Sequence, residues 1–433
     1  MRQSRSAMKL IPPLLFSLSL ALAAQDKPKD PFQKVPAAPP AAPSDLVDLT
    51  LLVETITLPQ ADYAAWLDVP ADREKLHERA VEAVQKGSAK LDGLHFVRTR
   101  EGNRFHLKSV DELRTPTEWD GALESGYQHP TAFETYLMGD ELEAEIALDG
   151  GGRRQMNHSL RRERFLGLRP VRADSTPPHV MAPDFLKKHA VSASRLLPGV
   201  PLLLATYALE GQITLVFGTQ RDVGLVKAPV PADSPARNLL ITARAFSLDR
   251  IRAWEMLRRH REDSAACLKE LQTMLAAKEA VQEHVSTVTT LSGQSGTHTA
   301  GRDYIHGSEF NPPMLDIKTA GATDGQAGHS AFTDTMLGYN WTAEPAFDDE
   351  NGVIATNLNF ANVTYAGDLK DANWSPNYPQ VPVFARQQIL TSLRQAPGST
   401  VLVSTFSPPG DTGVNDRQDT ARVWLLFLET SAK

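Results

Sequence analysis

Residues 195–211, RLLPGVPLLLATYALEG, and residues 394–410, RQAPGSTVLVSTFSPPG, share the pattern that decides the fold. In both segments an arginine precedes a Pro-Gly pair, and an apolar run, a threonine and a glycine follow. The two pairs are Pro198-Gly199 and Pro397-Gly398. Proline presets φ and glycine supplies a positive φ, so each pair predicts a tight turn that leads into a strand. The recurrence after 199 residues indicates an internal duplication.

The same separation relates turn and packing residues over about 80 residues of each copy. The matched positions are Gly139 with Gly338, Phe185 with Phe384, Arg195 with Arg394 and, at a separation of 188 residues, Trp66 with Trp254. None of them forms part of a recognisable catalytic set. The sequence therefore predicts a duplicated scaffold.

Each copy has the pattern of an α+β unit. A strand opens each copy, at Asp48 to Thr57 or at Leu239 to Phe246, and a helical stripe follows it. Residues 353–363 alternate between apolar and polar, whereas residues 423–428 are apolar on both faces, as in a central strand. We predict two tandem pseudo-repeats, each a mostly antiparallel sheet with one helix or helical hairpin packed on it.

The N-terminal residues predict export. Arg2, Arg5 and Lys9 precede a short apolar run that ends in small residues near Ala24, which is the order of a secretory signal peptide. Residues 1–24 are thus interpreted as a signal peptide and residues 25–45 as a linker rich in proline and alanine. A second proline-rich linker, residues 226–236, separates repeat 1 (46–225) from repeat 2 (237–433). The predicted location is the periplasm or the outer membrane.

Composition excludes several classes of protein. The 433 residues include 45 Lys and Arg against 52 Asp and Glu, a formal charge of −7, which argues against a nucleic-acid partner. The single cysteine, Cys267, excludes an intramolecular disulfide and any cysteine cluster for a metal. Cys267 lies in a helical stripe and is predicted to be a small core residue.

Repeat 2 contains an ordered series of motifs. They are Ser292-Gly293-Gln294, Leu337 to Trp341, Asp348 to Gly352, Val353 to Asn359, Pro382 to Arg386, Ala396 to Val403 and Val423 to Glu429. This order resembles the C-terminal homology domain of secretins, the outer-membrane channel proteins of type II and type III secretion and of type IV pilus systems. The resemblance covers most of residues 280–431 and implies a β-rich envelope protein that self-assembles or binds other envelope proteins. A second copy stands where family channels carry periplasmic modules, which favours an assembly or binding role over a pore.

One dense basic stretch has no equivalent in repeat 2. It contains Arg153, Arg154, Arg161, Arg162 and Arg164. Guanidinium groups bind phosphate and carboxylate through paired hydrogen bonds, so this stretch is a candidate site for an anionic lipid, a cell-wall polymer or an acidic partner. The alternative interpretation is a solvated face of a sheet.

No catalytic residues, metal ligands or cofactor are predicted. His284, His298 and His306 lack the spacing of a metal site, and Asp348 to Gly352 is typical of a hairpin turn rather than a calcium loop. The favoured function is that of a non-enzymatic, exported, secretin-like envelope protein that assembles through exposed strands. The alternatives are a periplasmic binding module for an anionic ligand and, from another class, an envelope hydrolase with a dispersed site.

Overall fold

The computed structural model describes residues 48–73, 75–120, 129–149, 152–171, 181–225, 238–260, 262–311, 328–369, 381–408 and 421–432. The predicted signal peptide (1–24) and the two predicted linkers (25–45 and 226–236) lie outside the described residues.

Each repeat supplies eight strands. In the first repeat the elements are β1 (Asp48–Pro59), α1 (Gln60–Asp68), α2 (Pro70–Arg73), α3 (Leu76–Gln85), β2 (Lys90–Arg100), β3 (Arg104–Asp120), β4 (His129–Leu148), β5 (Arg154–Pro170), β6 (Met181–Arg195), β7 (Leu202–Leu209) and β8 (Gln212–Val223). In the second repeat they are β9 (Asn238–Asp249), α4 (Arg250–His260), α5 (Ser264–Ala276), β10 (Ala280–Leu291), β11 (Gly296–Asn311), β12 (Gly328–Asp348), β13 (Val353–Asp368), β14 (Pro382–Gln395), β15 (Thr400–Phe406) and β16 (Arg422–Ala432).

The strands form two antiparallel sheets of eight strands. Sheet A has the order β10-β9-β16-β15-β2-β1-β8-β7, and sheet B has the order β11-β12-β13-β14-β3-β4-β5-β6. In each sheet the second repeat contributes the first four strands and the first repeat the last four, in the same relative order. The two repeats therefore lie head to tail, and the predicted α+β class with tandem repeats is confirmed.

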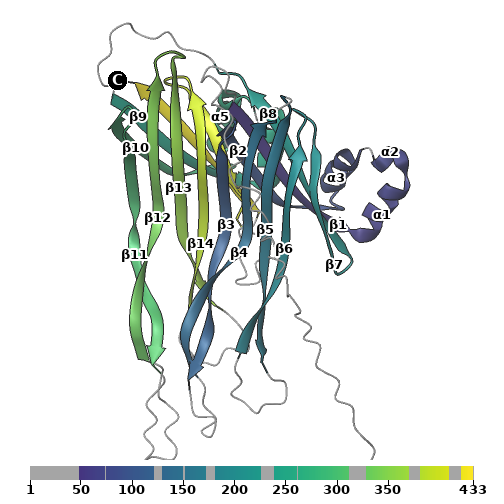
Figure 1. Cartoon of the computed structure of the whole chain (residues 1–433), viewed down its shortest axis with the longest axis vertical. Helices are drawn as coiled ribbons and strands as arrows, with labels where there is room; N and C mark the ends of the chain where they lie inside the picture. The colour runs from purple at the N-terminus through teal and green to yellow at the C-terminus, as the bar shows by residue number, and fades with distance from the viewer. Residues whose placement is uncertain are drawn as a thin grey trace, which may run out of the picture.

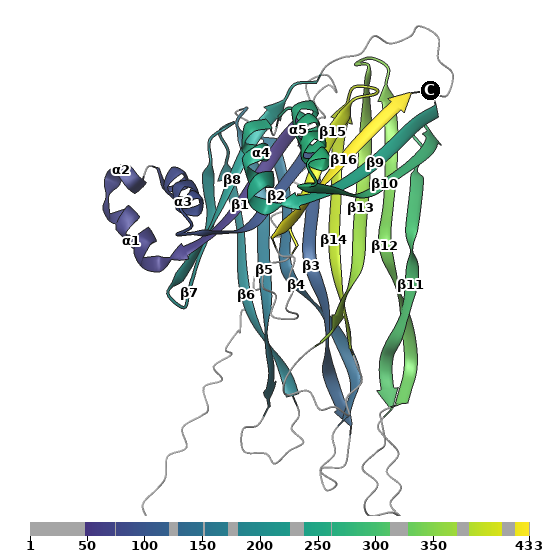
Figure 2. The same cartoon turned by 180° about the vertical axis from the view of Figure 1, so that it is seen from behind.

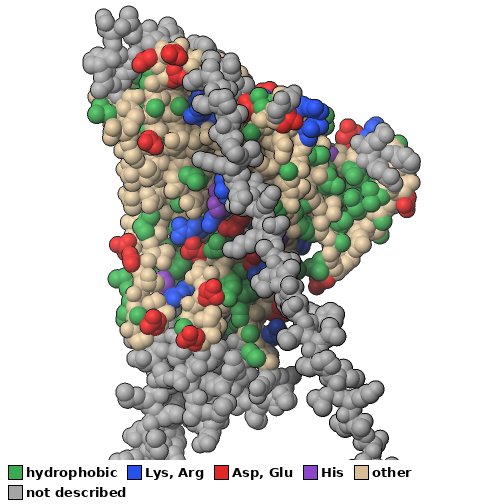
Figure 3. Space-filling model, in the orientation of Figure 1, with side chains coloured by type: hydrophobic (Ala, Val, Ile, Leu, Met, Phe, Trp, Pro, Cys, Tyr) green, Lys and Arg blue, Asp and Glu red, His purple; other side chains and the backbone are tan. Residues whose placement is uncertain are grey.

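The molecule has three layers. Sheet B forms one outer layer, sheet A lies behind it, and α4 and α5 cover the far face of sheet A (Figures 1 and 2). Figure 3 shows few charged or hydrophobic side chains on the outer face of sheet B, where Asn357 and Asn359 of β13 are exposed. Among the described helices, none combines the length and the apolar character needed to cross a membrane.

The hydrophobic core is continuous across the two repeats. Between the sheets, Leu51 of the first repeat belongs to the same buried cluster as Leu358 and Leu426 of the second. Between sheet A and the helices, Phe96 of the first repeat shares a cluster with Trp254 of the second. Burial of apolar surface thus stabilises the two repeats as one unit.

The segments with a predicted periodicity form the strands and helices that this periodicity indicates. In β13, Leu358 and Phe360 face the core while Asn357 and Asn359 face solvent, as the alternation requires. The apolar strand β16 lies centrally, between β9 and β15, with sheet B on one side and helices on the other. Helix α5 begins where Asp263 accepts a hydrogen bond from the Ala266 amide at 2.9 Å.

The duplicated turn residues make the same contacts in both repeats. Gly199 has a φ of 78° and donates its amide to Gln220 O at 2.7 Å, and Gly398 has a φ of 77° and donates to Thr430 O at 2.8 Å. Gly139 and Gly338 both have a φ of 128°. We call residues at the same register position of the two repeats counterparts. Val110 and Gly301 are an example, because they lie opposite Gly139 and Gly338, respectively.

We expect Gly338→Ala to destabilise the fold. A Cβ atom at Gly338 would lie 2.3 Å from Ala300 O and 2.7 Å from Gly301 Cα, and its φ of +128° is strained for alanine. The cost should be at least about 1–3 kcal/mol, because backbone atoms cannot move aside cheaply. Calorimetric unfolding should show a clear fall in Tm. Gly224→Ala is the control, since a Cβ atom there meets nothing within 4 Å. Equal Tm values for both variants would contradict this expectation.

Candidate functional site

Each sheet ends in two strands that have one neighbour each. In sheet A these are β7 and β10, and in sheet B they are β6 and β11. Strands β6 and β7 belong to the first repeat, whereas β10 and β11 belong to the second. We call these pairs the β6–β7 edge and the β10–β11 edge. Within the part of the chain that the structure describes, neither edge pairs with a further strand.

The junction between the repeats joins the same two types of edge. Residues 384–390 of β14 pair with residues 106–112 of β3, and Ser404 of β15 lies opposite Val97 of β2. By register, β14 and β15 are the counterparts of β6 and β7, and β2 and β3 are the counterparts of β10 and β11. The free edges of the chain are therefore of the two types that the intrachain junction already joins.

Hydroxyl groups complete the intrachain junction in sheet A. Thr405 Oγ1 accepts a hydrogen bond from the Phe96 amide at 2.8 Å and donates to Leu94 O at 3.0 Å. Ser407 Oγ accepts from the Leu94 amide at 3.0 Å. Thr206, the counterpart of Thr405, lies exposed on β7. The hydroxyl that serves the intrachain junction is thus retained on the β6–β7 edge.

An ion pair spans the intrachain junction in sheet B. Arg386 Nε on β14 contacts Glu112 Oε1 on β3. Their counterparts are Lys187 on β6 and Asp303 on β11, both exposed and on opposite free edges. Within the chain, Lys187 lies 3.7 Å from Glu163. The two free edges therefore carry the same pair of charge signs as the joined ones.

A buried ionic cluster is specific to the intrachain junction. Arg394 donates to Asp48 through its amide at 2.7 Å and through Nε at 2.9 Å. Arg98 donates to Arg394 O at 2.8 Å and lies 3.6 Å from Asp48. Arg195, the counterpart of Arg394, is exposed, and Thr289 stands at the position of Arg98. The joined and the free edges thus differ in their buried charge.

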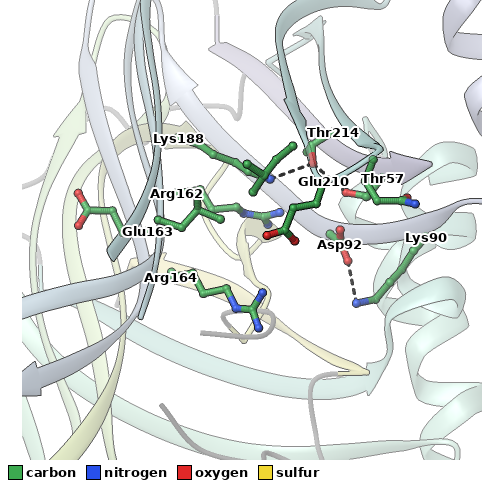
Figure 4. Close-up of a pocket in the computed structure, with 13 residues that line it drawn as sticks. Thr57, Lys90, Asp92, Arg162, Glu163, Arg164, Lys188, Glu210 and Thr214 are labelled. Carbon is green, nitrogen blue, oxygen red and sulfur yellow. Dashed lines mark hydrogen bonds and ion pairs between the residues drawn. The ribbon is translucent and has the colours of Figure 1, made fainter. Parts of the chain in front are cut away.

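A second polar feature is a cavity of about 240 Å³ between the two sheets of the first repeat. Arg162, Lys188 and Glu210 point toward one another in it (Figure 4). Lys188 Nζ donates to Thr214 Oγ1 at 3.2 Å. Burial lowers the pKa of Lys188, and the nearby Arg162 guanidinium lowers it further. The charged and hydroxyl residues that line the cavity are Thr57, Lys90, Asp92, Arg162, Glu163, Arg164, Lys188, Glu210 and Thr214.

Asp140 anchors the charges beside this cavity. Arg162 Nη2 donates to Asp140 Oδ2 at 2.7 Å, and His95 Nε2 lies 3.2 Å from the same oxygen. Burial alone would raise the pKa of Asp140, but the Arg162 guanidinium and its hydrogen bonds outweigh burial and hold that pKa well below its ordinary range.

The second repeat folds without these charges. The counterparts of Asp140, Arg162, His95 and Lys188 are Tyr339, Asn362, Ser286 and Gln387, respectively. Because the same sheet positions accept uncharged residues, the fold does not require the ionic cluster. Charges that a fold does not require, beside a cavity, indicate a candidate binding site.

The structure divides the predicted arginine site. Arg162 and Arg164 line the cavity, whereas Arg161 is exposed and lies 3.3 Å from Glu141. Arg154 contacts Asp222 at 2.7 Å, and Arg153 follows the turn between β4 and β5. The sequence prediction missed Lys188, Asp92 and Asp140. Comparison of the two repeats would have found Lys188 and Asp140, since each stands where the other repeat has an uncharged residue.

The remaining candidate residues are three histidines and Cys267, and their contacts indicate structural roles. The His284 and His298 rings lie 5.8 Å apart, and burial and then His298 lower the pKa of His284 to about 4. His306 Nε2 is 3.1 Å from Thr335 Oγ1. Cys267 is buried, and burial raises the pKa of its thiol to about 12. Among the described residues, no group of three or more His, Cys, Asp or Glu is placed to hold a metal ion.

Comparison with known proteins finds similarity at the level of structure. No protein-family model matches the sequence, and no curated protein matches it. The secretin domain of InvG from the Salmonella SPI-1 injectisome is similar over 65% of this chain and 88% of its own, with 12% identity and a TM-score of 0.26. The ETEC AspS–GspD pilotin–secretin complex is similar over 89% of this chain and 49% of the matched chain, with 8% identity and a TM-score of 0.21.

A third similar structure is the Klebsiella pneumoniae type II secretion system outer membrane complex of PulD, PulS and the PulC HR domain. It is matched over 76% of this chain and 64% of the matched chain, with 9% identity and a TM-score of 0.25. The similarity to secretin structures is thus low in both TM-score and identity, and no sequence-family match accompanies it.

We expect Asp140→Asn to destabilise the protein by about 3–5 kcal/mol at pH 7, because it leaves the Arg162 charge without its partner. The pKa of Asp140 is depressed from an ordinary value of 3.8, so its contribution to stability is present above about pH 4 and is lost as the pH falls. Urea unfolding at pH 7, 5, 3.5 and 2.5 should therefore show a difference from wild type that shrinks toward low pH.

The matched control is the double variant Asp140→Tyr with Arg162→Asn, which introduces the residues of the second repeat at both positions. It should recover at least half of the lost stability, because no buried charge remains unpaired. A difference for Asp140→Asn that grows as the pH falls would contradict the assignment of Asp140 as the stabilising carboxylate.

Proposed function

We propose that this protein is a non-enzymatic scaffold whose copies join edge to edge. In this proposal the β6–β7 edge of one copy pairs with the β10–β11 edge of the next. The observation that carries it is the junction inside the chain, where β14 and β15 meet β3 and β2 in the same head-to-tail order. One chain then represents two successive units of a longer array.

Physical chemistry supports this mode of assembly. Free edges expose unpaired backbone N–H and C=O groups, which a neighbouring strand of matching register satisfies. Because the two edges differ, the contact is heterologous, and it generates a ring if the rotation between copies closes or a filament if it does not. The retained Thr206 hydroxyl and the opposite charges of Lys187 and Asp303 would favour the same register as the intrachain junction.

The second part of the proposal concerns the cellular location of the protein and its biological role. We place the assembly in the cell envelope, as a scaffold in protein secretion or in the envelope itself. The order of positive residues, apolar run and small residues within 1–24 supports export. The motif order of residues 280–431 supports the secretin-like role. Fractionation of cells that express the full chain, with recovery in the cytosol alone, would contradict this part.

Charge reversal tests the assembly. Lys187→Glu and Asp303→Lys should each weaken the junction by about 1 kcal/mol, a roughly fivefold rise in the concentration at which half of the protein is assembled. An equimolar mixture of the two variants should regain the wild-type value, because Glu at position 187 then faces Lys at position 303. Analytical ultracentrifugation over a concentration series measures this.

The control is Lys269→Glu, a reversal at an exposed residue of α5, which belongs to neither edge. It should leave the assembly midpoint unchanged. A wild-type chain that stays monomeric up to its solubility limit would contradict the proposed function. Assembly that tolerates both reversals would contradict the register.

A second candidate function, the binding of a small anion, is favoured by the cavity in Figure 4. There the Lys188 ammonium donates to the neutral hydroxyl of Thr214, and a bound anion would offset the burial that lowers the pKa of Lys188. Arg162 and Arg164 line the same space.

If this second function holds, inorganic phosphate should raise the Tm of the wild type above the effect of equal ionic strength of chloride. Lys188→Gln, which introduces the residue of the second repeat, should lose at least half of that rise. Lys187→Gln is the matched control, since its side chain is more exposed and does not line the cavity. The same rise in the wild type and in Lys188→Gln would exclude the cavity as an anion site.

A further inference from the structure

The helix that follows β9 packs on the other repeat. Trp254 Nε1 of α4 donates to the Glu54 carboxylate on β1, and Arg250 Nη1 donates to Leu91 O at 3.0 Å and to Asp92 O at 2.9 Å on β2. Trp254 is 1% exposed and belongs to the same buried cluster as Leu91. Helix α4 of the second repeat therefore extends over β1 and β2 of the first repeat.

Helix α1 is the counterpart of α4, but it packs on no other repeat within the described chain. The sequence pairs Trp66 with Trp254, but by register Trp66 takes the position of the buried Met256. Within α1, all of whose residues the structure describes, no side chain is buried, and Tyr63 and Trp66 are only partly buried against the core. Val69, the residue after α1, is 46% exposed. Helices α1 to α3 project beyond β7, on the side of the β6–β7 edge (Figures 1 and 2), and Figure 3 shows hydrophobic side chains gathered over them.

The face that α4 covers in the first repeat is bare in the second. Leu94 is fully buried, whereas its counterpart Val285 on β10 is 54% exposed. Phe96 is fully buried, whereas its counterpart Thr287 is exposed. Leu291, at 44% exposure, extends the same face of β10. An uncovered helix at one end of the molecule thus has an uncovered sheet face at the other.

The charges on the uncovered helix and the uncovered face are also complementary. Under α4 the sheet carries the acidic Glu54, and α4 carries Arg250 and Arg258. Burial alone would raise the pKa of Glu54, but His77, Trp254 and Arg258 outweigh burial and lower that pKa. On the uncovered face of β9, Arg244 stands at the position of Glu54, while α1 carries Asp68 at the position of Arg258. Both partners have changed sign together, so opposite charges are kept.

We propose that α1 docks on the outer face of β9 and β10 of a second copy of this chain, with Asp68 beside Arg244 as Arg258 lies beside Glu54. This inference rests on the proposed edge-to-edge assembly and adds a helical contact to it. Thr242 and Thr287 stand where the first repeat has the buried Leu52 and Phe96, so this outer face of β9 and β10 is more polar than its counterpart, as a surface that water covers before assembly requires. The contact joins the same two ends as the strand edges do.

The experiment uses the assembled wild type and two variants. Hydrogen–deuterium exchange should show that residues 60–69 and 280–291 become protected on assembly. Trp66→Ala should raise the concentration for half-assembly at least about tenfold, as expected for a buried aromatic anchor. Val285→Asp, on the exposed outer face of β10, should raise this concentration to a similar extent, because it places a carboxylate beside the acidic α1. This variant keeps the test valid if Trp66→Ala fails to fold.

The matched control is Leu148→Ala, which truncates another exposed apolar side chain, on β4 and away from both ends. It should leave the midpoint unchanged. Assembly at wild-type concentrations in both test variants, with residues 60–69 still exchanging freely, would overturn the helix contact and leave the proposed function intact. Absence of any assembly in the wild type would overturn both.

Discussion

The pairing of β14 with β3, together with the contact of β15 with β2, is the interaction on which the rest of the structure depends. It converts four strands per repeat into sheets of eight and makes the core between the sheets continuous. It also fixes which strands are left over. Since the repeats point in the same direction along both sheets, one end of the molecule presents β6 and β7 and the other presents β10 and β11.

The joined and the free edges share geometry and differ in chemistry. Inside the chain, Ile389 lies opposite Leu107 in a buried position. At the free edges, their counterparts are Ala190 and His298. A permanent junction gains stability from apolar burial, whereas an edge that is exposed in the single copy must remain compatible with water. The less apolar pair at these two positions of the free edges therefore agrees with the contact between copies that we propose.

The two repeats have also diverged in their interiors. The first repeat keeps Asp140, Arg162 and Lys188 beside a cavity, and the second fills the same positions with uncharged residues. A fold that tolerates both solutions separates the scaffold from the chemistry placed on it. The strand edges that we propose for assembly carry features that the two repeats have in common, whereas the cavity is lined by charges that only the first repeat has.

The sequence by itself determined the duplication, the α+β class and the strands and helices with strong periodicity, because these depend on local patterns such as Pro-Gly turns and the alternation in β13. Only the tertiary structure decided that the repeats share their sheets and that Lys188 and Asp140 flank Arg162. Those contacts join residues far apart in the chain, as Asp48 and Arg394 do, and their partners depend on strand order and register. No local pattern encodes that order, because several strands of similar composition compete for each edge.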